Sequence, residues 1–334
     1  MAPSASSRTD TAGSWRWNLL AQRWVLVAPL RAERTHDHRE PDQPCPFCPG
    51  AEAQTPPEIA RVGDPWQVRV FPNRYAALSP VTVVWTDGLP TDPSPYETAA
   101  EPGFGHSEVV VLSPDHTRDW SQLSDAAVRA AAQMLCERIV DLGERPHVRA
   151  VLGFVNHGRA AGASREHPHA QVMATPMIPP ELVAEARSTS GAGCVLCGLD
   201  QDDPDLRVLE RESVLAVCPF WAEWDDEVLV VPRRHSPTAR PREEPLDRGT
   251  VAEAGTAVRD ILAALARLRG RDLAYNVIWH VGPDGGRSDF HWHVHLRPRR
   301  DAHAGFEQGT GLRINSVAPT VSAGHLRNAL RRAV

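Results

Sequence analysis

The chain contains one sequence pattern twice, and this duplication restricts its fold more than any other feature. Residues 45–48 (CPFC) in the first half correspond to residues 194–197 (CVLC) in the second. In both halves a segment rich in β-branched residues then leads from a glutamate to a histidine eight positions later, over residues 108–116 and again over 227–235. Each half is therefore expected to form the same supersecondary unit, in which a strand runs into a turn that carries a histidine.

A helix and a final strand complete each copy. Apolar residues at helical spacing predict helices over residues 124–142, with Ser124 as N-cap, and over roughly 248–268. The copies end in HPHAQ at residues 167–171 and in HWHVH at residues 291–295. Strands and helices alternate without a Gly-rich dinucleotide fingerprint. The sequence therefore predicts an α+β fold of two tandem duplicated modules with a largely antiparallel sheet.

The two copies divide the chain into an N-terminal module, residues 15–180, and a C-terminal module, residues 181–334. Residues 1–14 are small and polar and are expected to lack fixed structure. The first module is longer, because 68 positions separate its second cysteine from its first histidine, whereas 38 separate the matching residues of the second module. Most of the excess falls between residues 79 and 105, where five prolines predict a loop.

The composition argues against several classes of protein. A net charge of -6 and a pI near 6.2 provide no basic field that would attract nucleic acid. No run of 18 apolar residues is present, so no membrane association is expected, and the polar N-terminal stretch has no hydrophobic segment typical of a signal peptide. We therefore expect a globular, cytoplasmic protein. All 36 basic residues are arginine, which excludes a Walker A loop and every lysine-dependent covalent intermediate.

Four of the six cysteines form two C-x-x-C pairs, a spacing that suits a metal site better than a structural disulfide in the cytosol. Zinc in structural sites takes four Cys or His ligands in a tetrahedron. The duplication supplies two such sets, which are Cys45, Cys48, His116 and His167, and Cys194, Cys197, His235 and His291. The alternatives are a redox-active cysteine pair, or histidines that only occupy turns and a sheet.

The HPHAQ segment also predicts a catalytic centre. Residues two apart on a strand share a face, so His167, His169 and Gln171 line up on one side. With His167 bound to zinc, His169 remains available as a nucleophile toward phosphorus, because its imidazole is neutral near pH 7. Gln171 can donate its amide N–H to phosphoryl oxygens. A sugar 1-phosphate leaves as an anion without a proton donor, so these residues favour ping-pong transfer between two sugar phosphates.

These motifs resemble those of the galactose-1-phosphate uridylyltransferase family of the histidine-triad superfamily, along nearly the whole chain. The resemblance rests on WVLVAP at 24–29, FPN at 71–73, SPDH at 113–116, N-x-G at 156–158, G-x-S at 162–164 and, most specifically, HPHAQ at 167–171. It implies two histidine-triad modules in one chain and a homodimer. The implied substrates are a nucleotide sugar and a hexose 1-phosphate.

The resemblance also implies roles for individual residues. His169 would carry the uridylyl group, and Asn73 would lie beside the nucleotide. The phosphates would be held by Asn156, Gly162, Ser164 and Gln171. Arg31 and Arg34 would reach a nucleotide sugar that is bound mainly by the partner subunit, and Glu307 would contact sugar hydroxyls.

Two segments depart from the well-known bacterial uridylyltransferases, whose second metal site is built from a glutamate and histidines. The second C-x-x-C pair and residues 305–315 look instead like a branch that includes ADP-sugar phosphorylases. The predicted activity is transfer of a uridylyl group from UDP-glucose to a hexose 1-phosphate such as galactose 1-phosphate. Phosphorolysis of an ADP-sugar, or adenylyl transfer, is the alternative within the same superfamily.

The HWHVH segment has the full alternating triad of the histidine-triad hydrolases. It is either a second active site or a set of sheet residues left by the duplication, with His291 bound to zinc. Hydrolysis in the first module is disfavoured by Gln171. From a different class, the chain could be a catalytically inert scaffold stabilised by zinc, which would accumulate no nucleotidylated intermediate.

Overall fold

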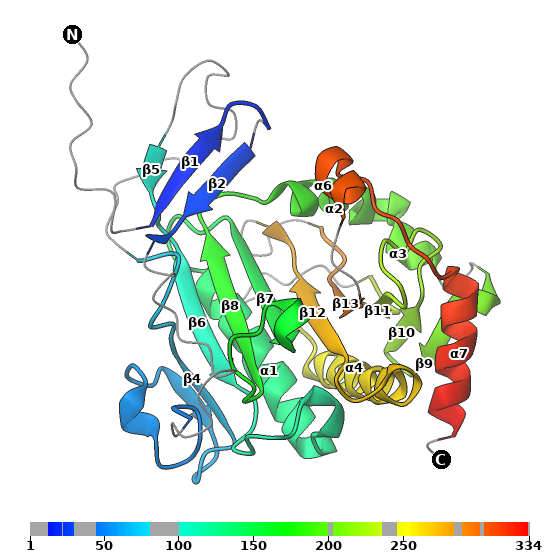
Figure 1. Ribbon diagram of the computed structural model, residues 1–334, viewed down its shortest axis with the longest axis horizontal. Coiled ribbons are helices and arrows are strands. Elements are labelled where there is room, and N and C mark those ends of the chain that lie inside the picture. The colour runs from blue at the N-terminus through cyan, green and yellow to red at the C-terminus, as the bar shows by residue number, and fades with distance from the viewer. Residues whose placement is uncertain are drawn as a thin grey trace.

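The computed structural model describes residues 13–21, 23–29, 45–80, 100–199, 203–235, 246–283, 289–300 and 304–332. One long sheet of ten strands runs through both halves of the chain (Figure 1). Neighbouring strands in this sheet are antiparallel throughout. The predicted α+β fold with an antiparallel sheet is confirmed.

The two halves of the long sheet contain matching strands in reverse order. The first half comprises, in spatial order, β3 (Ala60–Val62), β4 (Val68–Pro72), β6 (His106–Val111), β8 (His169–Thr175) and β7 (Ala150–His157). The second half continues with β12 (Ala274–His280), β13 (His293–Arg299), β11 (Val228–Pro232), β10 (Val214–Val217) and β9 (Arg207–Glu210). The pairing of β7 with β12 at the centre joins the duplicated modules into one sheet. The division at residue 180 itself stays a prediction.

A separate sheet is formed by three short strands near the N-terminus, in the order β2-β1-β5. They are β1 (Ser14–Asn18), β2 (Arg23–Val27) and β5 (Ala100–Pro102). Trp15, Trp17 and Trp24 pack against Leu78 in a small core of their own. Residues 1–12 and residues 81–99 of the predicted proline-rich loop lie outside the described residues, whereas Ser14 belongs to β1.

Three helices cover one face of the long sheet, and their apolar sides form the main core with it. They are α1 (Asp125–Gly143), α4 (Arg248–Arg269) and α7 (Pro319–Arg331). The two helices predicted from the sequence are thus confirmed, and the Ser124 hydroxyl accepts a hydrogen bond from the Ala127 N–H as an N-cap does. The shorter helices are α2 (Pro180–Thr189), α3 (Val195–Gly198) and α6 (Gly305–Thr310).

Among the described residues, short 3-10 helices lie between these elements at Glu52–Gln54, Trp120–Gln122, Arg159–Ala161, Gly191–Gly193 and Pro204–Leu206. Within the described ranges, no helix combines the length and the apolar character that crossing a membrane requires.

Alternation along the central strands separates the core from a polar face. Val155 of β7 and Val277 of β12 are buried in the main core beneath the helices. Their neighbours Asn156 and Asn276 therefore point to the opposite side of the sheet. This second face carries the candidate site.

A buried ion pair fastens α1 to the sheet. Arg138 of α1 donates from Nε and Nη2 to the two carboxylate oxygens of Glu108 on β6, at 2.7 and 2.8 Å. Both side chains are only 7% exposed. The bidentate geometry satisfies both charges at a place where an unpaired charge would be costly.

Replacing Arg138 with methionine should destabilise the fold by about 3–5 kcal/mol, because Glu108 then keeps a buried charge without its partner. Urea unfolding followed by circular dichroism measures this difference. The matched control is Arg129→Met on the same helix, where the side chain is exposed, and it should change the free energy of unfolding by less than about 0.5 kcal/mol. Equal losses in the two variants would show that the ion pair does not carry the stabilisation.

Candidate functional site

The candidate site lies where β8 and β7 meet on the polar face of the sheet. Ala170 and Val172 of β8 belong to the main core, so His169 and Gln171 point to the other side. Both are buried, with exposed fractions of 6% and 5%. The predicted pair thus shares one face.

Hydrogen bonding fixes the protonation pattern of His169. Its Nδ1 lies 2.9 Å from the carbonyl oxygen of His167, which can only accept a hydrogen bond. Nδ1 therefore carries the proton, and Nε2 carries the lone pair that a nucleophile needs. The Phe47 ring, from the first C-x-x-C segment, packs edge-on against the His169 ring at 5.4 Å between centroids.

The amide of Gln171 is oriented by Asn73. The backbone N–H of Tyr75 donates to Asn73 Oδ1 at 3.0 Å, so the other end of that amide, Nδ2, is the donor, and it lies 3.4 Å from Gln171 Oε1. With its oxygen used in this way, Gln171 has its Nε2 hydrogens to offer to a bound phosphate. The contact between Asn73 and Gln171 was not apparent in the sequence, because the two residues are 98 positions apart.

A tight turn brings Gly162 beside Asn156, and Ser164 follows two residues later. Gly162 has a positive φ of 83°, which an L-residue with a side chain rarely adopts. A Cβ at this position would have the Nδ2 atom of Asn156 as its only near neighbour, at 4.0 Å. Ser164 is buried at 3% exposure. The predicted phosphate ligands Asn156 and Gly162 therefore lie close together, and Ser164 is buried in the segment that follows the turn.

The first predicted zinc set is assembled in the structure. The ligand atoms of Cys45, Cys48, His116 and His167 all lie within 4.8 Å of one another. The S···N distances are 3.4, 3.6 and 3.8 Å, and the two Nδ1 atoms are 3.3 Å apart. A tetrahedron with Zn–S of about 2.3 Å and Zn–N of about 2.05 Å has edges of about 3.6 Å for S···N and about 3.3 Å for N···N. These residues fit zinc.

His167 links this Cys/His group to His169. Its Nε2 donates to the Ser113 carbonyl oxygen at 2.8 Å, which leaves Nδ1 as the ligand atom. Burial lowers the pKa of His167 to about 4, so the ring is in the neutral form that metal binding requires. Its own carbonyl oxygen accepts the bond from His169.

The second predicted set also comes together, from Cys194, Cys197, His235 and His291. Its S···N distances are 3.3, 3.4 and 3.5 Å, again close to tetrahedral edges. His291 Nε2 donates to the Pro232 carbonyl oxygen at 3.0 Å, and His235 Nε2 lies 2.9 Å from Asp289 Oδ1. Outer partners of this kind orient histidine ligands in metal sites.

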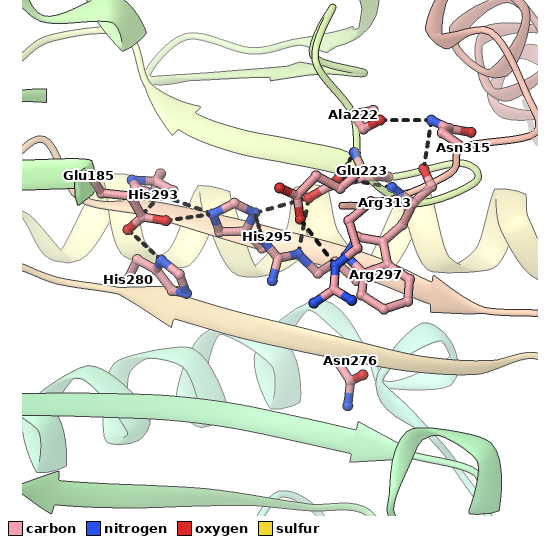
Figure 2. A network of polar contacts seen from close by, with 12 residues as sticks. Glu185, Ala222, Glu223, Asn276, His280, His293, His295, Arg297, Arg313 and Asn315 are labelled. Atoms are coloured by element: carbon pink, nitrogen blue, oxygen red, sulfur yellow. Dashed lines mark hydrogen bonds and ion pairs between the residues drawn. The ribbon is translucent and has the colours of Figure 1, made fainter. Parts of the chain in front are cut away.

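A third group was not predicted from the sequence. Glu185, His280, His293 and His295 point toward one another (Figure 2), with ligand atoms within 4.8 Å. His280 Nδ1 is 2.7 Å from Glu185 Oε2, and His295 Nε2 is 3.4 Å from Glu185 Oε1. His293 donates from Nδ1 to the His291 carbonyl oxygen, so the lone pair on its Nε2 faces this cluster. Three imidazoles and a carboxylate suit zinc or iron.

Protonation in this third group also favours a cation. Burial favours the neutral acid of Glu185, but hydrogen bonds to His280, His293 and His295 outweigh it and hold the carboxyl pKa well below its usual range. Burial lowers the pKa of His280 to about 3 and also lowers that of His293. An anionic carboxylate beside neutral His280 and His293 is the state in which such residues bind metal.

The third group changes the sequence interpretation in two ways. His293 and His295 were considered as a second active site or as sheet residues left by the duplication, and the structure gathers both around Glu185. The glutamate-histidine arrangement was also treated as replaced by the second C-x-x-C set, whereas this chain has both. Glu185 lies on α2, 95 positions before His280, and no spacing rule could have joined them.

The remaining predicted residues are less informative. Glu307 lies on α6, where its Oε2 accepts a hydrogen bond from the Ala304 N–H at 3.0 Å and caps that helix. Arg31 and Arg34 lie outside the described residues.

The sequence matches a known family. Residues 5–179, more than half of the chain, match the family described as galactose-1-phosphate uridyl transferase, N-terminal domain. The chain belongs to this family. Over 323 residues it is 29% identical to ADP-glucose phosphorylase of Arabidopsis thaliana, and the aligned region covers 90% of this chain and 88% of the relative. It is also 29% identical over 335 residues to galactose-1-phosphate uridylyltransferase of Thermotoga maritima, which covers 93% and 97%.

Solved structures agree with this membership over the whole length of the uridyl transferase fold. A structure of uridylyltransferase superposes with a TM-score of 0.76 at 26% identity, covering 96% of this chain and 99% of that one. ADP-glucose phosphorylase from Arabidopsis thaliana with bound ADP-glucose gives a TM-score of 0.73 at 27% identity, covering 94% and 98%. The predicted family and its nucleotidyltransferase class are confirmed, and relatives of both substrate types are similar to the chain to the same degree.

Replacing Cys45 with serine should lower zinc content and thermal stability together, because the first metal group ties the segment at 45–48 to β8. Zinc by inductively coupled plasma mass spectrometry and melting by calorimetry measure both effects. The control is Cys136→Ser, which changes a buried cysteine of α1 outside the three groups and should leave the zinc content unchanged. Full zinc occupancy with an unchanged melting curve in Cys45→Ser would rule out the assignment.

The Glu185→Ala variant tests the third group separately. We expect it to bind less metal than the unaltered protein under the same dialysis, because the substitution removes one of four ligands and its negative charge. The control is Glu181→Ala on the same helix, which lies outside the group. Identical metal content in the two variants would show that Glu185 holds no metal.

Proposed function

We infer that the protein transfers a nucleoside monophosphate from a nucleotide sugar to a phosphate acceptor through a covalent intermediate on His169. The inference is carried by one observation, the hydrogen bond from His169 Nδ1 to the His167 carbonyl oxygen, which directs the lone pair to Nε2. The family membership supports the same reaction class.

In the first half-reaction, His169 Nε2 attacks the α-phosphorus of the nucleotide sugar. The bond from that phosphorus to the bridging oxygen breaks, and a sugar 1-phosphate leaves with the electron pair. Its second pKa is about 6, so no proton has to be supplied. In the second half-reaction, an anionic phosphate acceptor attacks the same phosphorus and releases His169.

The amide donors provide the electrostatic part of catalysis. Gln171 Nε2 and Asn156 Nδ2 are both oriented by hydrogen bonds to their oxygens, and both can donate to the oxygens of the transferred phosphoryl group. An amide cannot take a proton from water. This property favours transfer to an already anionic acceptor over hydrolysis.

The metal groups have a structural part in this proposal. The first group would hold residues 45–48 and His167, and through them it would keep the backbone carbonyl under His169 in place. Zinc, when bound, supplies a fixed tetrahedral centre there. No chemical step requires it.

For the substrates, we favour UDP-glucose as donor and a hexose 1-phosphate such as galactose 1-phosphate as acceptor, in line with the Thermotoga maritima relative. Phosphorolysis of ADP-glucose is the second candidate. It is favoured by the Arabidopsis thaliana relative and by the second Cys/His group, which looks like the branch that includes ADP-sugar phosphorylases. An inert scaffold would give no role to the ordered amides around His169.

We also infer a homodimer, in which Glu307, Arg31 and Arg34 would contact the sugar nucleotide held mainly by the partner subunit. The segment that carries Glu307 exposes several large apolar side chains, which are Phe306 at 51%, Leu312 at 62% and Ile314 at 64%. Exposed apolar surface of this kind is typical of an interface. Light scattering on the purified protein measures the oligomeric state.

Incubation of the purified protein with UDP-glucose or ADP-glucose should add the mass of one nucleoside monophosphate per chain, and intact-protein mass spectrometry detects it. The His169→Ala variant should show no adduct, because it lacks the nucleophile. Release of the adduct by galactose 1-phosphate or by inorganic phosphate then identifies the acceptor. An adduct of equal yield on His169→Ala, or no adduct on zinc-replete protein with either sugar nucleotide, would contradict the proposal.

A further inference from the structure

We propose that Asn276 and Arg299 are positioning residues that hold the Asn156 carboxamide with its N–H groups toward the transferred phosphoryl group. Both belong to the second module, on β12 and β13. The inference rests on the proposed function, in which Asn156 binds phosphate. It does not follow from the duplication, because the position that matches Asn276 in the first module is Leu152.

Asn276 and Asn156 face each other directly across the joint between the modules. They are register partners in the β7–β12 pair, so their side chains lie on the same face. Asn276 Nδ2 donates to Asn156 Oδ1 at 2.7 Å and to the carbonyl oxygen of Ala161 at 3.0 Å. Asn276 is 6% exposed. One buried amide thus contacts Asn156 and the turn that precedes Ser164.

Arg299 decides which way the Asn276 amide points. Its Nε lies 2.6 Å from Asn276 Oδ1, and a guanidinium can only donate. The oxygen of Asn276 must therefore face Arg299, and its NH2 group must face Asn156. The Asn276 NH2 group needs an acceptor, so the oxygen of the Asn156 amide must face it. The Nδ2 atom of Asn156 then points toward the Gly162 turn, where a Cβ added to Gly162 would lie 4.0 Å from it.

The guanidinium itself is held by an aromatic ring. Arg299 Cζ lies 4.0 Å from the centroid of Trp224, and Arg313 stacks on the same ring at 5.5 Å. Asn315 secures the backbone of this segment by donating to the Ala222 and Trp224 carbonyl oxygens (Figure 2). In Figure 2 the Asn276 side chain lies apart from the Glu185 cluster.

The orientation matters because the two ends of an amide are opposite in polarity. With Nδ2 toward the phosphoryl group, Asn156 stabilises the charge that develops in the transition state. With Oδ1 there instead, it would repel the same oxygens. The chain from Trp224 through Arg299 and Asn276 selects the first arrangement.

The test compares Asn276→Asp and Asn276→Leu, each made in the unaltered protein and in Asn156→Ala. An aspartate keeps the size and the bond to Arg299 but can only accept from Asn156, so it should reverse the Asn156 amide. A leucine, the residue at the matching position of the first module, leaves that amide free to rotate. Rates of His169 labelling by UDP-glucose and ADP-glucose, affinities for UDP and ADP by calorimetry, and melting temperatures are measured for every protein.

We expect Asn276→Asp to slow labelling by about 100-fold and to weaken nucleotide binding by about 10-fold. Asn276→Leu should have smaller effects on both, although it is the more drastic change in polarity. In the Asn156→Ala background, Asn276→Asp should cause only the smaller loss that comes from its broken bond to the Ala161 carbonyl oxygen, because the donor that it acts through is absent.

Three results would overturn the inference. They are a loss for Asn276→Leu as large as that for Asn276→Asp, a full loss in the Asn156→Ala background, and the absence of both labelling and nucleotide binding in the unaltered protein. Failure of the proposed function looks different. Labelling would then be absent, while binding of UDP or ADP would still show the coupling between Asn276 and Asn156, and the positioning role would stand.

Discussion

The candidate site depends on the hydrogen bond between the His167 carbonyl oxygen and His169 Nδ1. His167 lies just before β8, and its ring belongs to the first metal group while its carbonyl oxygen accepts from the neighbouring imidazole. The tautomer of His169 is therefore set by the backbone, and that stretch of backbone is held by a tetrahedral ligand set assembled from segments far apart in the sequence. In the proposed function, folding, metal affinity and the geometry of His169 would be linked through one residue.

The polar groups that the described strands bring to the His169 side of the sheet include the amides of Asn73, Asn156 and Gln171. Two relays end on this side, from Tyr75 through Asn73 to Gln171, and from Arg299 through Asn276 to Asn156. Each relay begins with a group that can only donate a hydrogen bond. This determines which end of every amide along the relay accepts and which end donates. Such donors keep their polarity across the physiological pH range, and the site can stabilise phosphoryl charge without a titrating acid.

The sequence was sufficient wherever a local pattern carried the information. Helical spacing and the Ser124 cap predicted α1, and the duplicated C-x-x-C pairs led to both Cys/His groups, because ligand spacing repeats with the fold. The sequence was insufficient where a contact joins elements that have no repeated residue spacing in common. Glu185 on α2 has no motif of its own, and Asn276 reads as an ordinary strand residue until the β7–β12 register places it opposite Asn156. Contacts of this kind follow from strand order, which spacing alone does not determine.

The two modules have the same histidine geometry, but different groups face the two histidines. His293 donates from Nδ1 to the His291 carbonyl oxygen at 3.0 Å, much as His169 does to His167 at 2.9 Å. Both rings therefore turn a lone pair toward the polar face. In the second module Glu185 occupies the space in front of that lone pair, so the protein's own carboxylate stands where the first module would receive a substrate phosphate. An equivalent transfer at His293 would bring phosphate oxygens against this carboxylate, and the repulsion between the two anions would favour His169 as the site of the proposed transfer.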